Sequence, residues 1–231
     1  MNKCKKCNKT LNIKNRKFCS IKCSNQFNQN NKKNIKIKIG YSKELAELFG
    51  ILIGDGSVTK YYTRIYLSAK ADKGYSKNIL KLVNKVFPLT RVAIKYRKDR
   101  GTEELQISSK DISDYFFKLG FKPKARKIPN WIKNNEEFSK SSLRGLFDTE
   151  GSISIKKFKG KNKISTYKQL TFTNKNKEII KFVKITLRKL KLSNSETNGY
   201  NVYISNKQNI AKYFQEIGTK NPKLEKKYKM K

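Results

Sequence analysis

The 231-residue sequence predicts an α+β fold made of two copies of one α-β-β-α-β-β-α unit behind a small cysteine-rich module. Three observations predict it: a long internal repeat, four cysteines confined to the first 23 residues, and alternation of apolar and polar residues in several segments. Period-two alternation is typical of antiparallel strands with one covered face. We therefore divide the chain into a module (1–25), a polar, Asn-rich, basic linker (26–40) and two repeats (41–131 and 132–231).

The cysteines of the module occur as two close pairs, Cys4-x2-Cys7 and Cys19-x3-Cys23. Two such pairs separated by a short basic loop match a structural Zn²⁺ site with four thiolate ligands. Two disulfides are the alternative, although a reducing compartment disfavours them. A module this short needs a metal to fold, so we expect one Zn²⁺ here.

The repeat becomes visible when the two halves are compared from their openings, residues 45–58 and 143–155. Each opening is followed by two strands, an amphipathic helix, two more strands and a last helix. A repeat this long, seen twice, indicates a duplicated unit rather than a solenoid. Equivalent segments are strands 64–70 and 169–175, helices 76–87 and 177–190, strand–helix segments 105–120 and 202–218, and basic segments 122–127 and 221–227.

The openings themselves have the apolar spacing of helices, as in Leu45, Leu48 and Leu52. Small residues recur every four positions on both, which lets two helix backbones approach closely. Glycine inside a helix costs about 0.5–1 kcal/mol relative to alanine, and close crossing of the two helices supplies the reason. The stripes are Ala46, Gly50 and Gly54 in the first helix and Ser141, Gly145 and Thr149 in the second.

The charge of the chain indicates a polyanionic partner. Lys and Arg number 55 against 17 Asp and Glu, a formal charge of +38. Nucleic acid would neutralise this charge and release counterions, whereas a merely solvated surface is the alternative. No apolar run of about 18 residues or secretory signal is found, so we expect an intracellular protein without a membrane span, from a prokaryote, a phage-infected cell or an organelle.

The predicted strands place basic and polar residues on one face and apolar residues, such as Ile65 and Leu67, on the other. A cationic sheet face fits the groove of double-stranded DNA, where strands can reach base edges. We expect DNA contacts from Arg64, Tyr66, Ser68, Lys70, Arg91, Lys95, Arg97, Arg100 and Gln106 in the first half, and from Ser154, Lys156, Gln169, Thr171, Thr173, Asn201 and Tyr203 in the second.

Each opening helix ends in an acid followed by glycine, Asp55-Gly56 and Glu150-Gly151, at equivalent places 150 − 55 = 95 residues apart. The C-terminus of a helix is the negative end of its dipole and disfavours a carboxylate. A divalent cation between two such ends would relieve the repulsion and suit phosphodiester hydrolysis. A single acid-glycine pair would be a simple helix stop, but two at equivalent positions indicate a site.

The segments ELFGILIGDGS and LRGLFDTEGSI resemble the two signature motifs of the LAGLIDADG homing endonucleases in their single-chain form, and the resemblance covers about residues 41–228. It implies a monomeric saddle with pseudo-twofold symmetry whose antiparallel sheets lie in the DNA major groove. It also implies Mg²⁺-dependent cleavage of both strands of a long asymmetric target, as in intron or intein homing, with short 3′ overhangs.

By position in these motifs, Asp55 and Glu150 are the acids that share two or three Mg²⁺. The carbonyls of Gly54 and Thr149 are candidate further ligands, while Asp148, whose counterpart is Ile53, has a structural role. Aligning Pro123 with Pro222 places Lys124 and Lys223 where the family has a lysine near the scissile phosphates, with phosphate positioning as the simpler role. The cysteine module resembles small zinc modules that some nucleases carry as an additional DNA clamp.

Three other functions fit part of the sequence. A non-cleaving DNA-binding regulator or an RNA maturase would keep the fold, but neither needs both acids. A ribosome-associated structural protein would explain the charge and neither the acids nor the duplication. The chain has no histidine, which excludes nucleases with a histidine general base.

Overall fold

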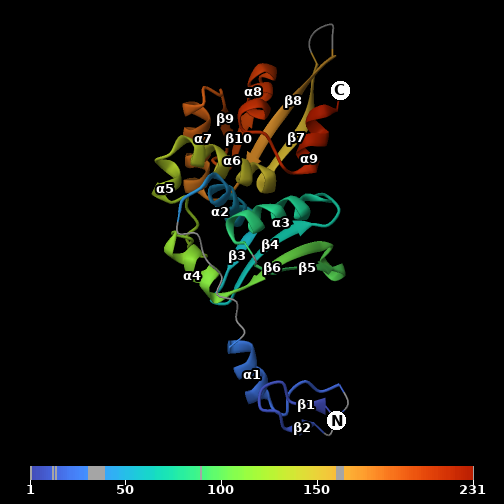
Figure 1. Ribbon diagram of the computed structural model, residues 1–231. Coiled ribbons are helices and arrows are strands. Elements are labelled where there is room, and N and C mark those ends of the chain that lie inside the picture. Colours follow the sequence, from blue (N-terminus) through green and yellow to red (C-terminus); the bar gives the residue numbers. More distant parts are fainter. Residues whose placement is uncertain are drawn as a thin grey trace. The chain divides into compact units, whose positions relative to one another are not determined.

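The computed structural model describes residues 2–11, 13, 15–30, 40–88, 90–159 and 164–230. The chain forms two compact units, Met1–Lys36 and Ile37–Lys231 (Figure 1). Most of the predicted 26–40 linker lies outside the described residues, which resume at Gly40. Within the described part of the chain, no helix is both long and apolar enough to cross a membrane.

The N-terminal unit is an antiparallel hairpin followed by one helix: β1 (Asn2–Lys3), β2 (Thr10–Leu11) and α1 (Ile21–Asn30). The helix continues through residues 26–30, which we had assigned to the linker. Cys4 is the only buried residue among those described here. A unit with so little core depends on another interaction to hold it together.

The first repeat has the predicted order of elements, and its strands form one antiparallel sheet in the order β3-β4-β6-β5. A 3-10 turn joins β5 to β6. The elements are α2 (Lys43–Asp55), β3 (Gly56–Val58), β4 (Tyr62–Ser68), α3 (Tyr75–Val86), β5 (Val92–Arg97), η1 (Lys98–Arg100), β6 (Thr102–Ser108) and α4 (Lys110–Lys118).

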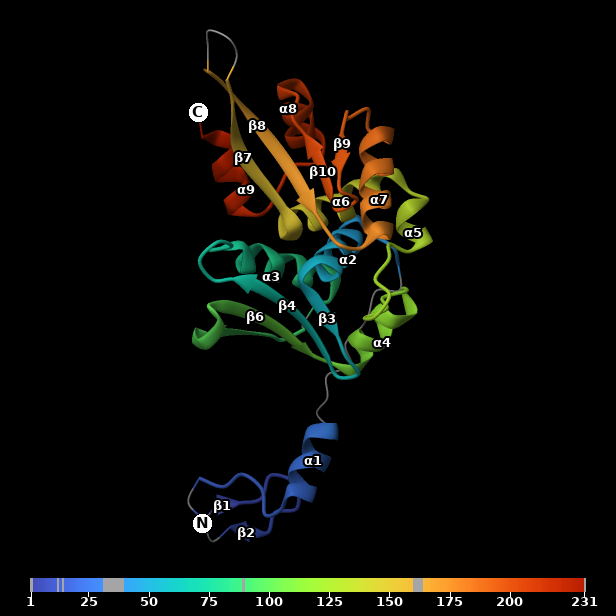
Figure 2. The same cartoon turned by 180° about the vertical axis from the view of Figure 1, so that it is seen from behind.

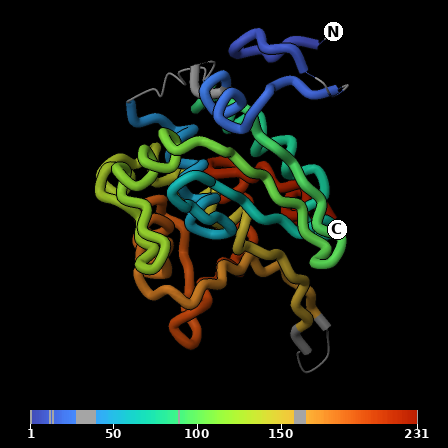
Figure 3. The backbone as a smooth tube through the Cα atoms, turned by 90° about the horizontal axis from the view of Figure 1, so that it is seen from below, coloured from blue at the N-terminus to red at the C-terminus, as the bar shows by residue number. Residues whose placement is uncertain are grey.

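The second repeat has the same order from α6 to α8, with a further helix before and after, and its strands form an antiparallel sheet β7-β8-β10-β9. Strands β7 and β8 pair well beyond β10 and project from the body (Figure 3). The elements are α5 (Asn130–Lys133), α6 (Glu136–Glu150), β7 (Gly151–Lys159), β8 (Ile164–Thr173), α7 (Lys177–Lys189), β9 (Ser195–Thr197), β10 (Asn201–Ile204), α8 (Lys207–Glu216) and α9 (Pro222–Lys229).

The α+β fold and its duplication are thus confirmed. Helix α9, which we had expected only as a basic segment, starts with two recognisable signals. The Asn221 side chain accepts a hydrogen bond from the amide of Lys223, and Pro222 occupies the first helical position. An N-cap asparagine followed by proline is a typical helix start.

The helices α2 and α6 lie side by side at the centre of the body (Figure 2). A Cβ on Gly50 would clash with the carbonyl of Ser142, and one on Gly145 would lie 2.9 Å from the amide nitrogen of Ile51. The predicted close crossing is therefore confirmed, although the contact of Gly50 is Ser142 rather than Ser141 of the stripe. Glycine here is required by the approach of two backbones.

Candidate active site and nucleic-acid interface

The predicted acids are the last residues of the two central helices. Asp55 ends α2 and Glu150 ends α6. The helices still touch at this level, because a Cβ on Gly54 would lie 2.8 Å from Thr149 Cβ and 3.4 Å from Glu150 Cγ. One carboxylate from each repeat therefore lies where the C-terminal ends of α2 and α6 meet.

The electrostatics of the two acids disfavour their charged forms. Burial, together with the negative charges of Glu150 and Asp72, raises the pKa of Asp55 to about 7, and the positive charges of Lys223 and Arg126 oppose the shift. Burial also raises the pKa of Glu150, opposed by Arg126 and by Asn174, whose Nδ2 donates to Oε1 at 3.3 Å. Two neighbouring carboxylates at the negative ends of helices are a donor set that fits a hard divalent cation.

Arg126 is a residue of this site that the sequence analysis missed. Its Nη1 donates to the carbonyls of Ile53 and Gly54 at 2.7 and 2.8 Å, and its Nη2 to Gly56 O at 2.7 Å. It thereby satisfies carbonyls that the end of α2 leaves free. The Gly54 carbonyl, a candidate metal ligand, already has this partner. The available signal was the position of Arg126 inside the basic segment 122–127.

The equivalent place at the end of α6 is occupied by Asn221, which is fully buried. Its Nδ2 donates to Asp148 O at 2.7 Å and to Asp72 Oδ1 at 2.9 Å. A neutral amide therefore does at one helix end what a guanidinium does at the other. The two helix ends therefore differ in the charge of the side chain that donates to their carbonyls.

The two candidate lysines are placed differently. Lys223 Nζ lies 2.9 Å from Asp72 Oδ1 and lowers the pKa of both Asp55 and Glu150. Lys124 is exposed and forms no ion pair with any residue that the structure describes. Of the two lysines, Lys223, from the second repeat, is thus the one whose positive charge stabilises the charged forms of both acids.

Asp148 is fully buried, as a structural role requires. Its Oδ2 accepts from the Tyr75 hydroxyl at 3.2 Å and from the Lys220 amide at 3.0 Å, and Thr219 donates to Oδ1. These partners come from both repeats. A buried carboxylate needs such partners. Asp148 therefore ties the end of α6 to Tyr75 of the first repeat and to the segment that holds Thr219 and Lys220.

The polar face of the first sheet follows the predicted alternation. In the strand pairing, Arg64 lies opposite Gln106, Tyr66 opposite Glu104, and Lys95 also opposite Glu104, while Ile65 and Leu67 are buried on the other face. The face also contains Ser57, Ser68, Ala93, Arg97 and Thr102.

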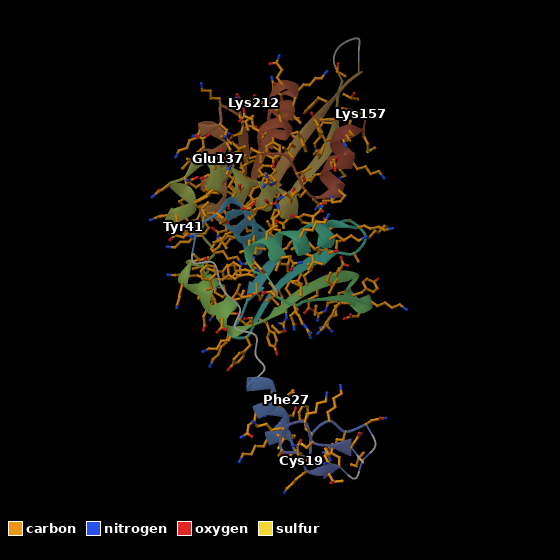
Figure 4. All side chains as sticks on the ribbon, in the orientation of Figure 1. Cys19, Phe27, Tyr41, Glu137, Lys157 and Lys212 are labelled. Atoms are coloured by element: carbon orange, nitrogen blue, oxygen red, sulfur yellow. The ribbon has the colours of Figure 1, made fainter. Side chains whose placement is uncertain are left out.

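The polar face of the second sheet also follows the prediction, and all seven expected residues share it. Its strand pairs are Ser154 with Gln169, Lys156 with Tyr167, Tyr203 with Thr171, and Asn201 with Thr173. Ser152 and Ser195 lie on the same face. Over both units, nitrogen-tipped side chains project from the surface (Figure 4).

Several details of the first sheet differ from the expectation. Lys70 lies in the turn after β4, Arg91 just before β5, and Arg100 in η1, so none of them is a strand residue. The alternation of strand 91–97 predicts that Ile94 and Tyr96 lie on the covered face with Ile65 and Leu67, but they are 42% and 64% exposed because β5 is an edge strand.

One acid, Glu104, lies in the middle of the polar face of the first sheet. It is 5% exposed and forms ion pairs with Arg64 and Arg97. The alternation of the strand places Glu104 on this face, but it does not tell which bases the acid neutralises.

The four cysteines of the N-terminal unit are free and lie together (Cys19 is labelled in Figure 4). Their sulfur atoms all lie within 4.8 Å of one another, with Cys7 to Cys19 at 3.4 Å and Cys19 to Cys23 at 3.5 Å. Thiolates around one tetrahedral Zn²⁺ are about 3.8 Å apart, given a Zn–S bond of about 2.3 Å. The cluster therefore fits a metal ion, and the structure holds none of the disulfides considered above.

Comparison with known proteins identifies related sequences. Residues 137–218 match the family model of the LAGLIDADG-like domain. The chain is 31% identical over 144 residues to an uncharacterized protein of Methanocaldococcus jannaschii, covering 61% of this chain and 52% of that one. It is 28% identical over 182 residues to the Replication factor C small subunit of the same organism, covering 77% of this chain and 10% of that one. The chain thus spans about half the length of one relative and a tenth of the other.

Solved structures show the same fold. Variants of the homing endonuclease I-DmoI align with a TM-score of 0.53 at 20% identity, covering 76% of this chain and 95% of theirs. The meganuclease I-SmaMI, bound to uncleaveable DNA, aligns with a TM-score of 0.55 at 12% identity, covering 81% and 89%. The chain therefore carries a LAGLIDADG-like domain and has the fold of the single-chain LAGLIDADG homing endonucleases.

Proposed function

We propose that this protein is a divalent-metal-dependent endonuclease that cuts both strands of duplex DNA at the ends of α2 and α6. The observation that carries the proposal is the meeting of Asp55 and Glu150, one from each repeat, at two helix C-termini. The raised pKa of each carboxyl marks a place where a bound cation would offset the cost of holding both acids in their charged forms.

Duplex DNA is the substrate that the surface favours. The chain carries a formal charge of +38, and both sheets present a polar face. Structures of I-DmoI with DNA and Mn and of I-LtrWI with its target DNA support this assignment by analogy of fold. The two faces differ in side chains, which favours a long target with unlike halves and a monomeric enzyme.

Each residue of the site has a proposed role. Asp55 and Glu150 would hold the metal ions, Mg²⁺ in our proposal, and the bound ions would supply an activated water and stabilise charge on the leaving oxygen. Lys223 lies near both acids and is placed to neutralise a phosphate, while Lys124 is assigned a phosphate contact at the exposed counterpart position. Arg126 holds the end of α2, and hence Asp55, in place.

A non-cleaving regulator or an RNA maturase with this fold is the alternative. The retained acids favour cleavage, because uncompensated carboxylates facing phosphates weaken binding. The homing context, intron or intein, is part of the proposal and is supported by the similarity of fold to homing endonucleases alone.

The proposed activity is tested on duplex DNA from the locus that encodes the chain, intact and with the coding insertion removed. With Mg²⁺, the wild type should cut both strands of the uninterrupted DNA, and EDTA should stop it. Asp55→Asn and Glu150→Gln should each slow cutting at least a hundredfold, about 3 kcal/mol, with binding within about tenfold. Glu137→Gln, an exposed acid of α6, is the control and should cut normally. Near wild-type cutting by either site variant would contradict the assignment.

We further propose that the four cysteines bind one Zn²⁺ and that the N-terminal unit adds DNA affinity without taking part in cleavage. Elemental analysis should find one zinc, and Cys19→Ser should lose it. Deleting residues 1–35 should weaken binding and flatten its salt dependence, because basic contacts are removed. Cutting at saturating protein should persist; its loss in a folded truncated protein would overturn this role.

A further inference from the structure

A buried carboxylate joins three strands on the polar face of the first sheet. Glu104, on β6, faces Tyr66 on β4 and Lys95 on β5 in the strand register. Its Oε1 lies 3.2 Å from Arg64 Nε, and its Oε2 lies 3.2 Å from Arg97 Nε. One acid on a central strand therefore holds one arginine from each neighbouring strand.

Both arginines are held by the same atom, Nε. Arg64 Nε also donates to Gln106 Oε1 at 2.8 Å, and its guanidinium lies 4.6 Å from the ring centroid of Tyr62. Among the described residues, the terminal amino groups of Arg64 and Arg97 have no hydrogen-bond partner. Because a guanidinium is rigid and planar, anchoring Nε leaves the outer pair of amino groups free as an oriented fork.

A carboxylate in this place works against DNA affinity, since it faces the same phosphates as the surrounding bases. Its burial, at 5% exposed, also requires the partners that it has. We expect this cost to be offset because Glu104 fixes the side-chain conformations of the two arginines before DNA binds. An arginine already fixed before binding loses less side-chain freedom on contact, and a fork of two N–H donors matches guanine O6 and N7 in the major groove.

We propose that Glu104 is a positioning residue that sets the target specificity of the first repeat, by holding Arg64 and Arg97 as readers of two guanines. The inference rests on the proposed function and adds to it the source of selectivity. It assigns a negative charge on the DNA-facing sheet to discrimination between bases, not to affinity.

The experiment selects DNA from a randomised duplex library with the full chain and no added Mg²⁺, which prevents cleavage and leaves the zinc of the N-terminal unit in place. The wild type should enrich sites with guanine at two positions of one half-site. Glu104→Gln should reduce the preference at both positions by about tenfold, the size of two weakened bidentate contacts. Its affinity for unselected duplex should be unchanged or higher, because a negative charge has been removed.

Glu103→Gln is the matched control: it removes the same charge from the neighbouring residue of the same strand, on the opposite face. Its selected sites should match those of the wild type. Arg64→Lys and Arg97→Lys, which keep the charge and remove the fork, should each lose one of the two guanines, and they serve if Glu104→Gln proves unstable in a thermal unfolding scan.

The outcomes separate the two levels of the proposal. A wild type that enriches no sequence would contradict the proposed function itself. Enriched sites whose guanine preferences survive in Glu104→Gln, or in both lysine variants, would overturn the role of Glu104 and leave the nuclease assignment standing.

Discussion

The two repeats share one backbone plan and differ in the charge of the faces they present. The first face carries Arg64, Arg97 and Glu104 in one ion-paired group. The second face is built from serine, threonine, glutamine, asparagine and tyrosine, with Lys156 toward the outer end of β7. A duplicated fold can thus keep its register while its surface chemistry diverges, which suits the recognition of two unlike half-sites.

The helix ends show the same division. Both need a donor for their free carbonyls, but α2 has Arg126 and α6 has Asn221. The cation at one end and the amide at the other give Asp55 and Glu150 different surroundings. What the repeats share are the glycines at which the backbones of α2 and α6 touch.

The shared part should show the largest effect. Gly50→Val and Gly145→Val each place side-chain atoms against the backbone of the other helix. We expect each to lower the free energy of unfolding by about 3 kcal/mol, the upper range for overpacking. Urea denaturation measures this, and Gly40→Ala, with nothing near its Cβ, should change little. A large cost at one glycine and none at the other would break the equivalence of the helices.

The different caps should show a smaller effect. Arg126→Ala removes three hydrogen bonds to carbonyls at the end of α2, so we expect a loss of about 2 kcal/mol in unfolding free energy. Arg126→Lys keeps the charge and cannot form the same fork, so it should recover less than half of that loss. Lys124→Ala, on the same segment, should stay within about 0.5 kcal/mol of the wild type. Full recovery by lysine would mean that charge alone matters.

The smallest effect concerns pH. The folded pKa of Asp55, about 7, lies above that of an unfolded aspartate, so the metal-free folded protein binds the extra proton between about pH 4 and 7. The stabilisation that comes from the raised pKa of Asp55 is fully present below about pH 4 and is lost as the pH rises through about 7. Asp55→Asn should therefore be more stable than the wild type by about 1–2 kcal/mol at pH 8, allowing for partial solvent exposure, and equal to it at pH 4. A constant difference across this range would contradict the shift.

The order of elements, the crossing of α2 and α6 and the polar sheet faces were predictable because each depends on local spacing. Arg126 was not, since its carbonyl partners lie 70 to 73 residues away along the chain. The exposure of Tyr96 depends on which strand lies at the sheet edge, and the pairing of Glu104 depends on side chains from other strands. The order of strands in a sheet and the pairing of distant side chains produce no periodic pattern in the sequence, so they could not be predicted from it.

The central claim is that one acid from each repeat forms a single metal site. Titration of the full chain with Mn²⁺, followed by electron paramagnetic resonance of the free ion, tests it without any DNA substrate. We expect saturable binding by the wild type and by Glu137→Gln, and at least tenfold weaker binding by both Asp55→Asn and Glu150→Gln, because each removes one of two ligands. Binding that survives unchanged in either site variant would show that the two helix ends do not share a metal.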